Sequence, residues 1–498
     1  MTAPVRDTKG RRWPILVVLV LLVAVGIGAQ HQRDQRTTPP QPVQVEQLQP
    51  VAAGPATLSS TWYCAAGTAT GTATGLAEQT VVVENASGQA RGGRITVMTD
   101  SGRTAARSFQ VPAHDHLDLK VSDIIVAPYA SAVVEMVGGE AAVAHVLSGP
   151  TGTTTAACSS TPSADWYVPT GTTAPGNRQL LALFNPFPSD AIATVSFATD
   201  AGVRAPDSYN GLVIPGGQVT VLDVSAVVTL RTQLATTVSV REGRLIVDQL
   251  QSADGTNGTN KGLSVTPAAP SGAPTWWFAD GPATAGAHTV LGVQNPTSSP
   301  VKVTVALRLD ANGSVSPFVA DVAAGGYSLI DVTGDGRVPV GVGFTAVASA
   351  AGGRPVVVDR VVSAAAPNVP DGFDVTLGSP ALATRWLIPV GSLPAASQAT
   401  LIVTNPSGRR PVKVTVSTVS GGQVAPVTGT TQTEIVAAGG RGGFVVPTGA
   451  KVTETSLEVV ASSPVVVEER LTFTAGGQSS ALAVPVAPSA TLTWPAQL

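Results

Sequence analysis

The fold is decided by residues 300–309, which read PVKVTVALRL. From 301 to 309 every second residue is valine or leucine, and most of the residues between them are polar. A period of two places one set of side chains in a core and the other in water, which is typical of a β-strand with one buried face. The hexapeptide PVKVTV returns at 411–416, so the strand belongs to a repeated unit.

A tryptophan followed five residues later by a glycine marks each unit. The period is 104 residues and then twice 110 residues, and the four pairs are Trp62/Gly67, Trp166/Gly171, Trp276/Gly281 and Trp386/Gly391. Asparagine-proline follows the tryptophan by nineteen residues in the last three units, at 185–186, 295–296 and 405–406, whereas the first unit has Asn85-Ala86. Four copies of one unit therefore make up the body of the chain.

Each unit contains short alternating strands that are separated by turn signals. Glycine pairs precede a strand in the last three units, and glycine allows the positive φ that a tight turn needs. These pairs stand at 216–217, 325–326 and 439–440. Six or seven strands in about 110 residues predict an all-β chain of four tandem immunoglobulin-like β-sandwich modules.

The end of the chain leaves a second arrangement open. Residues 486–490 and Trp494 resemble the segment around Trp276, so the chain stops just inside the start of a fifth repeat. Either this segment closes the fourth sandwich, or the ends of the repeat region meet in a closed β-propeller-like arrangement. A propeller blade has about four strands, so the length of the unit favours separate sandwiches.

A membrane-engaging segment begins the chain. Residues 15–29 are uncharged and apolar, and with Trp13 and Pro14 the stretch has a length between that of a signal-peptide core and that of a bilayer span. Basic residues outnumber acidic ones by three before it, so that end is expected to stay in the cytoplasm. We expect a single-pass anchor in the cell membrane with the bulk of the chain outside the cytoplasm. Cleavage after Ala29 would instead give a secreted protein.

These features divide the chain into seven parts. We predict a cytoplasmic tail at 1–12, a transmembrane signal-anchor at 13–29, a flexible linker rich in proline and glutamine at 30–60, and β modules 1 to 4 at 61–160, 161–270, 271–380 and 381–498. The linker has few large apolar residues to bury and contains the run PPQP at 39–42, which favours an extended spacer.

Composition limits the classes of partner. Charged residues make up 12% of the chain, against roughly 25% in an ordinary soluble domain. The net charge of −3 provides no basic surface for a nucleic acid, so we expect no nucleic-acid partner. The hydrophobic fraction of 43% is enough for a core and excludes an intrinsically disordered chain.

Two cysteines are present, Cys64 beside the first tryptophan and Cys158 at the end of module 1. In an exported protein an even pair is most often a disulfide, and we predict one here. His114, His116 and Asp118 would share a face of an extended strand, where they could hold a divalent metal, but a polar turn explains the same residues. We expect no metal site and no cofactor.

The residue after each tryptophan is a candidate ligand platform. The tryptophans themselves are expected in the cores. Tyr63, Tyr167 and Trp277 follow the first three, and neighbouring residues of a strand point to opposite faces, so one ring of each pair is expected outside the core. Such rings could stack on sugars or pack against a neighbouring module.

Signatures of catalysis are missing from the sequence. There is no Gly-x-Ser-x-Gly, no His-Glu-x-x-His, no phosphate-binding Gly-x-x-x-x-Gly-Lys and no cysteine cluster. Acidic residues recur at the ends of the valine-rich strands as Asp248-Gln249, Asp359-Arg360 and Glu469-Arg470, with Ala144-His145 in module 1. Recurrence in every unit favours structural pairing across strands over a single active centre, and we predict that the chain is not an enzyme.

The N-terminal anchor, Trp62-Tyr63-Cys64, the Asn-Pro hairpins and the acid-tipped last strands resemble an uncharacterised family of actinobacterial exported proteins, a domain of unknown function. The resemblance implies a non-enzymatic protein of the cell envelope, and the family's association with membrane glycosyltransferases suggests a link to surface polysaccharide. We therefore expect a non-catalytic, membrane-anchored scaffold or interaction surface whose partner is an envelope protein or polysaccharide. The alternatives are an array of saccharide-binding modules and an envelope hydrolase.

Overall fold

The computed structural model describes residues 45–72, 75–310, 313–365, 371–391, 398–427, 433–446, 456–473, 476–488 and 491–492. The predicted cytoplasmic tail, the signal-anchor at 13–29, residues 30–44 of the predicted linker and Trp494 lie outside these residues. Within the described part of the chain, no helix combines the length and hydropathy needed to cross a bilayer.

Module 1 is a sandwich of two antiparallel sheets. One sheet has the order β1 (Ser59–Cys64), β6 (Ala130–Val137), β3 (Arg91–Thr99) and β4 (Thr104–Val111). The other has the order β5 (Asp115–Lys120), β2 (Glu78–Asn85), β7 (Ala141–Gly149) and β8 (Gly152–Ala157). Val81 and Val83 of β2 and Ile95 and Val97 of β3 are buried in the core cluster of module 1, as an alternating pattern predicts.

Modules 2 and 3 repeat this plan. In module 2 one sheet contains β12 (Gly202–Arg204), β11 (Ala191–Thr199), β15 (Leu234–Glu242), β9 (Asp165–Val168) and β13 (Leu212–Ile214), and the other β14 (Gln218–Asp223), β10 (Asn177–Asn185), β16 (Ile246–Ala253) and β17 (Gly262–Pro267). In module 3 the sheets contain β18 (Thr275–Gly281), β24 (Phe344–Ala350), β20 (Val301–Leu309), β21 (Gly313–Ser314) and β22 (Phe318–Val322), and β23 (Tyr327–Asp331), β19 (Ala287–Gln294), β25 (Val357–Ala364) and β26 (Gly372–Leu377).

Module 4 joins its two sheets through one long strand. Its strands are β27 (Ala381–Ile388), β28 (Gln398–Thr404), β29 (Val412–Ser420), β30 (Gln423–Pro426), β31 (Thr433–Val436), β32 (Arg441–Val446), β33 (Ser456–Thr472), β34 (Gln478–Leu482), β35 (Val484–Pro485) and β36 (Thr491–Leu492). The 17 residues of β33 pair first with β29 and then with β28. The all-β sandwich fold expected from the sequence is confirmed in all four modules, and helix in the described residues is confined to short segments such as α2 (Val224–Val227).

The repeated asparagine closes a hairpin from inside. The side-chain amide of Asn295 donates to the carbonyl oxygens of Ser299 (2.8 Å), Val322 (3.2 Å) and Ala323 (3.0 Å). Asn405 makes the equivalent set of hydrogen bonds, and so does Asn85, although alanine follows it instead of proline. The asparagine is therefore the residue of the motif that stabilises the turn, because its side-chain amide donates to buried carbonyls that the turn leaves without strand partners.

The turn that these asparagines hold needs one residue of positive φ. Gly217, Gly325 and Gly439 supply it in modules 2 to 4, with φ of 69°, 63° and 67°. In module 1 the same position is His114, with φ of 48°. His114 is thus a turn residue in the left-handed region.

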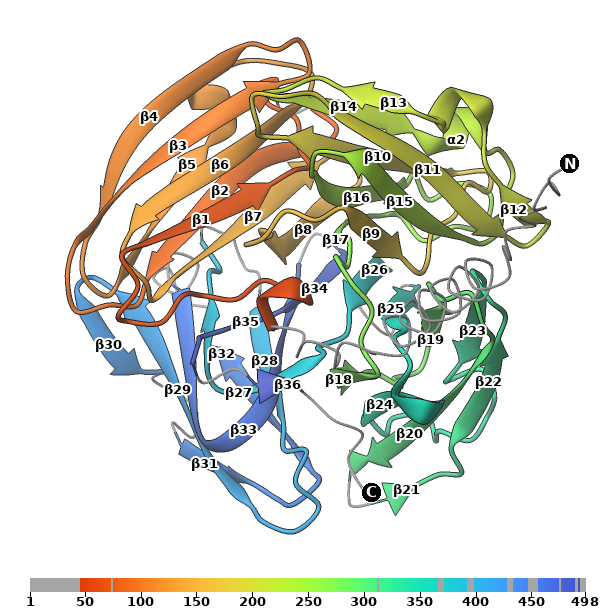
Figure 1. Ribbon diagram of the computed structural model, residues 1–498. Helices are drawn as coiled ribbons and strands as arrows, with labels where there is room; N and C mark the ends of the chain where they lie inside the picture. The colour runs from red at the N-terminus through yellow and green to blue at the C-terminus, as the bar shows by residue number, and fades with distance from the viewer. Residues whose placement is uncertain are drawn as a thin grey trace, which may run out of the picture. The chain divides into compact units, whose positions relative to one another are not determined.

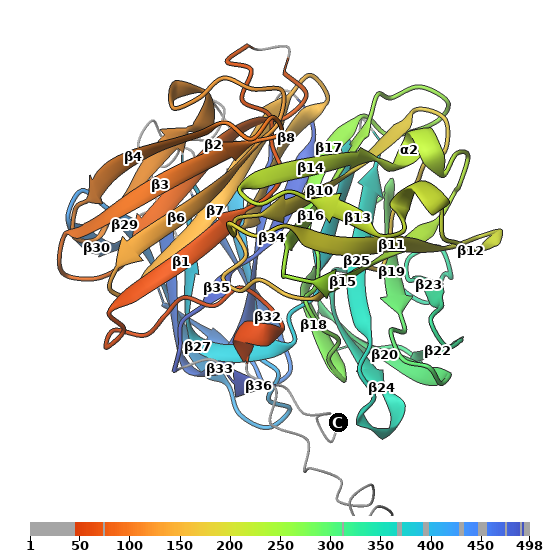
Figure 2. The same ribbon diagram turned by 45° about the horizontal axis from the view of Figure 1, so that its top comes forward.

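The four modules follow one another around a common axis (Figure 1). One strand of each module lies at this axis, because β8 contacts β17, β17 contacts β26, β26 contacts β34, and β34 contacts β8. Figure 1 shows these four strands close together between the modules, and Figure 2 shows the molecule turned so that modules 1 and 2 come forward. The modules are therefore sandwiches, as expected, and they also form the closed ring that the sequence left open as the alternative.

Hydroxyl groups connect the four axial strands. The Thr154 hydroxyl of β8 accepts from the Val265 N–H of β17 (3.2 Å) and lies 3.3 Å from the Ser479 hydroxyl of β34. Further hydrogen bonds join Thr266 to the Val375 carbonyl (3.0 Å) and Thr376 to the Ser480 carbonyl (3.1 Å). The serines and threonines of these strands thus replace strand-to-strand pairing at the axis.

Residues 45–54, which we call the strap, help to close the ring. The Ala52 N–H donates to the Pro485 carbonyl (2.9 Å), and the Ala487 N–H donates to the Ala52 carbonyl (2.9 Å). Ala52 and Val486 are both buried in the core cluster of module 1. The beginning and the end of the folded region therefore meet between modules 4 and 1.

Candidate functional site

The four recurring tryptophans are core residues, at most 1% exposed. The residue after each of them is directed away from that core and lies on the next module. Tyr63 packs against the core cluster of module 2, and Tyr167 packs against that of module 3. Trp277 joins a cluster with Ile402 and Val466 of module 4. In module 4 this position is Leu387, which is buried in the core cluster of module 1.

The predicted ligand platform is therefore located at the module interfaces. Tyr63 and Tyr167 are partly buried, and Trp277 is 1% exposed. The Trp277 ring offers no free face for stacking on a sugar in this arrangement. The other role expected for these rings is contact with a neighbouring module, and all three side chains make such a contact. Saccharide binding by this set stays a prediction.

Each of the first three interfaces is also held by a buried acid. Asp248 of module 2 accepts hydrogen bonds from the backbone N–H groups of Ala65 (2.9 Å) and Ala66 (3.0 Å) in module 1. The same role belongs to Asp359 toward Thr170 and to Glu468 toward Ala279. These acids satisfy the N–H groups of the loop that follows each tryptophan, so they join modules and do not pair strands within one sheet.

The acid of module 4 is one residue away from the position read from the sequence. Glu468 pairs with Ile402 in β28, three residues before Asn405, as Asp359 pairs with Gly292 three residues before Asn295. The alignment of the repeats in the sequence predicts Glu469 at this position. Because neighbouring strand residues face opposite sides, a shift of one residue exchanges the two faces. In modules 3 and 4 the strand partner of the acid lies three residues before the recurring asparagine, and this spacing identifies Glu468.

The seam between modules 4 and 1 has a different composition. Module 1 carries Ala144 where the other modules carry the acid. Glu84 of β2 is fully buried here, and burial, together with repulsion from Glu458, raises its pKa well above the usual range. Arg385 forms ion pairs with Glu140 of module 1 and with Glu458 of its own module. The seam therefore depends on charged groups and on Leu387.

The interface of modules 3 and 4 contains a buried ion pair. The Arg360 guanidinium is 2.7 Å from the Glu468 carboxylate, and both side chains are at most 1% exposed. Burial acts to lower the pKa of Arg360, but the neighbouring Glu468 and Asp280 carboxylates raise it overall. Asp280 also pairs with Arg441 (3.3 Å) and Arg470 (3.0 Å) of module 4. Removing one partner of such a pair leaves an uncompensated buried charge, so a neutral substitution at Arg360 or Glu468 alone is destabilising.

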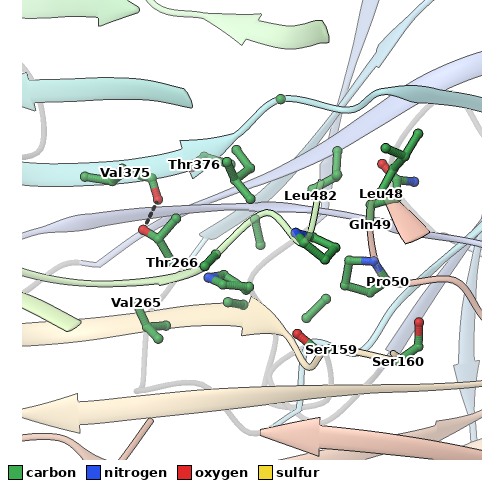
Figure 3. A pocket seen from close by; sticks show the side chains of 18 of the residues that line it. Leu48, Gln49, Pro50, Ser159, Ser160, Val265, Thr266, Val375, Thr376 and Leu482 are labelled. Carbon is green, nitrogen blue, oxygen red and sulfur yellow. Dashed lines mark hydrogen bonds between the residues drawn. The ribbon is translucent and has the colours of Figure 1, made fainter. Parts of the chain in front are cut away.

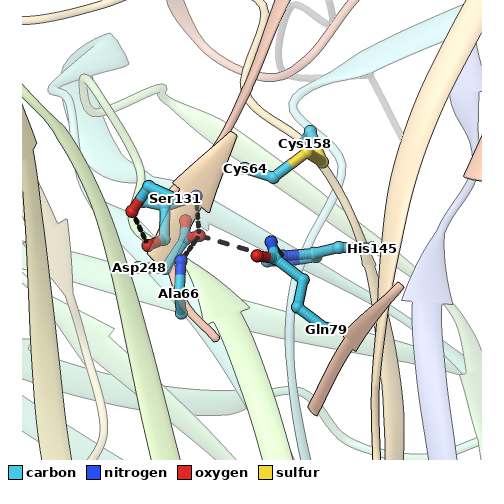
Figure 4. The surroundings of a disulfide bond; sticks show 8 residues. Cys64, Ala66, Gln79, Ser131, His145, Cys158 and Asp248 are labelled. Atoms are coloured by element: carbon cyan, nitrogen blue, oxygen red, sulfur yellow. Dashed lines mark hydrogen bonds and ion pairs between the residues drawn. A yellow bond between two sulfur atoms is a disulfide. The ribbon is translucent and has the colours of Figure 1, made fainter. Parts of the chain in front are cut away.

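The predicted disulfide is present and lies beside the first interface (Figure 4). Cys64 and Cys158 are bonded and close a loop of 94 residues between the two ends of module 1. The His145 ring lies next to the two sulfurs, its Nδ1 atom is 3.2 Å from the Gln79 amide nitrogen, and its Nε2 atom is 4.0 Å from an Asp248 carboxylate oxygen. The disulfide thus fixes the loop whose N–H groups donate hydrogen bonds to Asp248.

Burial controls the protonation of this pair. It lowers the pKa of His145 to about 4. It raises the pKa of Asp248 to about 7, against the opposing effect of the hydrogen bonds from Ala66 and Ala65. Both groups are fully buried, so neither can exchange protons with a bound substrate. A general acid or base must reach the reacting group, and this pair is enclosed by protein.

Metal-ligating atoms come together at one place in the described part of the chain, at Cys64, Cys158 and His145. The two sulfurs are consumed by the disulfide, so they are not thiolate ligands. The sequence-based alternative, a metal held by His114, His116 and Asp118, finds no support in this geometry, because His114 occupies the turn position described above.

A small cavity lies where the strap meets the ring axis (Figure 3). Its volume is about 60 Å³, and its walls include Leu48 and Pro50 of the strap and the Trp166 and Trp276 rings. Sites for small organic ligands have volumes of roughly 300–1,000 Å³. The cavity has room for a few water molecules, and the strap already covers it.

A family model described as a family of unknown function (DUF5719) matches residues 148–271. The matched stretch begins just before β8 and ends just after β17, so it contains module 2 together with the axial strand of module 1. No curated protein matches the chain.

The chain is also similar to solved structures. A crystal structure of Thermotoga maritima 1070 has 19% identity and a TM-score of 0.18 over 22% of this chain and 93% of that chain. The Anabaena sensory rhodopsin transducer has 20% identity and a TM-score of 0.16 over 18% of this chain and 92% of that chain. A tetra-tandem repeat of a large adhesion protein has 10% identity and a TM-score of 0.11 over 88% and 100%. Values this low support no conclusion about function.

Proposed function

We propose that the chain is a non-catalytic scaffold of the cell envelope, anchored by its N-terminal segment and displaying a ring of four β modules outside the cytoplasm. The observation that carries this proposal is the use of the buried polar groups. Asp248, Asp359 and Glu468 each join one module to the preceding one. Groups that could act in chemistry are engaged in holding modules together, which suits a protein that works by presenting surfaces.

A rigid ring supports such a role for a physical reason. Four sandwiches connected only by short linkers would adopt many relative orientations, and binding one partner would then carry the entropic cost of ordering them. The interface acids, the axial hydroxyls and the seam fix the orientations before any partner arrives. Partners on different modules would be held at constant separation.

The scaffold is tested by opening the ring in cells. Leu387 is fully buried in module 1, so Leu387→Glu places a charge in the seam, while Val460, which is 47% exposed, provides the matched control Val460→Glu. In intact cells treated with a lysine- or carboxyl-reactive crosslinker, we expect the control to keep the neighbours of the natural protein and the seam variant to lose those that span two modules. An unchanged set of neighbours in the open-ring variant would contradict the proposal.

The predicted topology is tested separately. A reporter placed after residue 498 should be digested when protease is added to intact cells, whereas one placed before residue 1 should be protected. The opposite pattern, or protection of both reporters, would contradict both the extracytoplasmic location of the scaffold and its N-terminal anchor.

A further inference from the structure

The outer edge of module 1 differs from the outer edges of the other modules. β4 is the last strand of its sheet and runs without a break for eight residues, Thr104–Val111. The corresponding edges of the other modules are divided into two short strands, β12 and β13, β21 and β22, and β30 and β31. Short or interrupted edge strands protect a sheet against the addition of another strand. Module 1 lacks this protection.

The backbone of β4 is available for pairing on its outer side. Among the described strands β4 is paired with β3 alone, and five of the seven residues from Thr104 to Gln110 are exposed, while Ala105 and Phe109 are half-buried. The hairpin fixes which backbone groups face outward, because the Thr99 N–H donates to the Arg103 carbonyl (3.0 Å). Antiparallel partners alternate between bonded and non-bonded pairs. The backbone groups of Thr104, Ala106, Ser108 and Gln110 therefore point away from β3.

The β3–β4 hairpin is basic in a chain of net charge −3. From residue 91 to residue 111 it carries four arginines and one acid, namely Arg91, Arg94, Arg103, Arg107 and Asp100. Arg94 and Arg107 are exposed, and neither forms an ion pair within the described residues. In the ladder Arg94 lies opposite Glu135 of β6, whereas Arg107 lies opposite Ile95, so an incoming strand would meet the positive charge of Arg107 beside the free edge.

We infer that β4 is a docking edge for an extended, acidic segment of a partner polypeptide, which adds to the sheet as a strand beyond β4. The inference rests on the proposed scaffold function and names one surface that serves it. Backbone hydrogen bonds to the outward groups of β4 supply affinity, and side chains opposite the arginines supply selectivity. An acidic side chain opposite Arg107 satisfies that charge, whereas Arg94 lies one strand further in, on the other face of the sheet.

A second copy of the chain is a poorer occupant of this edge. In an antiparallel pair of β4 strands centred on Arg107, which matches the outward groups of Ala106 with those of Ser108, the two Arg107 side chains would lie directly opposite each other. Like charges in neighbouring positions on paired strands destabilise the pairing. The charge of the edge therefore favours a different, acidic polypeptide.

The test uses a matched pair of substitutions at one position. Ser108→Pro removes an outward N–H and leaves the ladder to β3 intact, since proline is tolerated where the N–H of an edge strand faces solvent. Ser108→Ala keeps the N–H and removes only the hydroxyl. Equal unfolding midpoints for the two full-length variants establish that both are folded.

Partners are captured in intact cells through a photoreactive benzoylphenylalanine at Gln110 on β4. The control position is Val319 on β22, which is 57% exposed on an interrupted edge of module 3. We expect a crosslinked polypeptide at position 110 whose yield falls about tenfold with Ser108→Pro and changes little with Ser108→Ala. Mapping of the crosslinked peptide is expected to give a segment rich in Asp and Glu.

Three results would overturn the inference. These are equal yields in the two Ser108 variants, a crosslinked segment without acidic residues, and a crosslink to a second copy of this chain. Crosslinks at position 319 alone would remove the docking edge and leave the scaffold, whereas no crosslinks at either position would count against both.

Discussion

Asp359 in module 3 accepts hydrogen bonds from both the backbone N–H (3.0 Å) and the hydroxyl (2.7 Å) of Thr170 in module 2. Asp359 is fully buried, so these two donors have no access to water as a substitute partner. The pairing of both Thr170 donors therefore depends on a single side chain.

Asp359→Ala is expected to lower the free energy of unfolding by about 2–4 kcal/mol, because it leaves the Thr170 donors buried without an acceptor. The control is Asp321→Ala, since Asp321 is exposed and pairs with exposed Lys302, a contact worth about 0–1 kcal/mol. Denaturant midpoints of the two variants measure both effects. Equal midpoints would contradict the role given to Asp359.

Stability is expected to fall as the pH rises from about 4 to 8. Burial raises the pKa of Asp248 and Asp359 to about 7 and that of Glu469 to about 8 in the folded chain. The unfolded chain loses these protons at lower pH, so each carboxyl reduces stability between its unfolded and its folded pKa, with a slope of up to about 1.4 kcal/mol per pH unit.

His145 acts in the opposite direction, because its pKa is lowered to about 4 and its contribution to stability increases up to its unfolded pKa of about 6.5. The decrease should therefore be clearest from pH 6.5 to 8. Unfolding midpoints across this range measure it, and Glu469→Gln should flatten the part above pH 7. A midpoint that is constant or rises from pH 6.5 to 8 would refute the expected titration.

Leu387→Glu is expected to open the seam between modules 4 and 1. The substitution places a carboxylate in a fully buried, apolar site of the module 1 core. Burying an unpaired charge there costs more free energy than the contacts of the seam supply, so modules 4 and 1 are expected to separate. Small-angle scattering should show a larger radius of gyration, while Val460→Glu should leave it unchanged. An unaltered radius for the Leu387 variant would show that the seam closes without this contact.

His114→Gly is expected to stabilise module 1 by up to about 1 kcal/mol. Histidine is strained at its φ of 48°, whereas glycine takes this conformation readily in the other three modules. The greater freedom of glycine in the unfolded chain offsets part of the gain. Thermal unfolding of the variant measures the difference, and a clear loss of stability would mean that the His114 side chain has another role.

Local features of the repeat could be predicted from the sequence. The alternating valines, the buried tryptophans and the turn before the second sheet depend on short-range spacing, and the disulfide followed from a single pair of cysteines. These features are set by neighbours within one module, where periodicity reports directly on burial.

The contacts between modules could not be predicted in the same way. The position after the tryptophan is Tyr63, Tyr167, Trp277 or Leu387, so its role is constant while its residue type is not. Module 1 carries Ala144 at the position of the interface acid, so the acid does not recur in every repeat of the sequence. Ring closure joins Ala52 to Val486 across more than four hundred residues, and no local period reports such a contact.

The position of the strap determines how a pull on the chain would be distributed. Leu48 packs with the core of module 3, Val51 lies with Ala381 of module 4, and the Glu140 N–H of module 1 donates to the Ala53 carbonyl. Tension entering through residue 45 would load three modules at once and would shear their contacts together instead of unzipping them one by one. The strap thus distributes a force on the N-terminal segment over modules 1, 3 and 4.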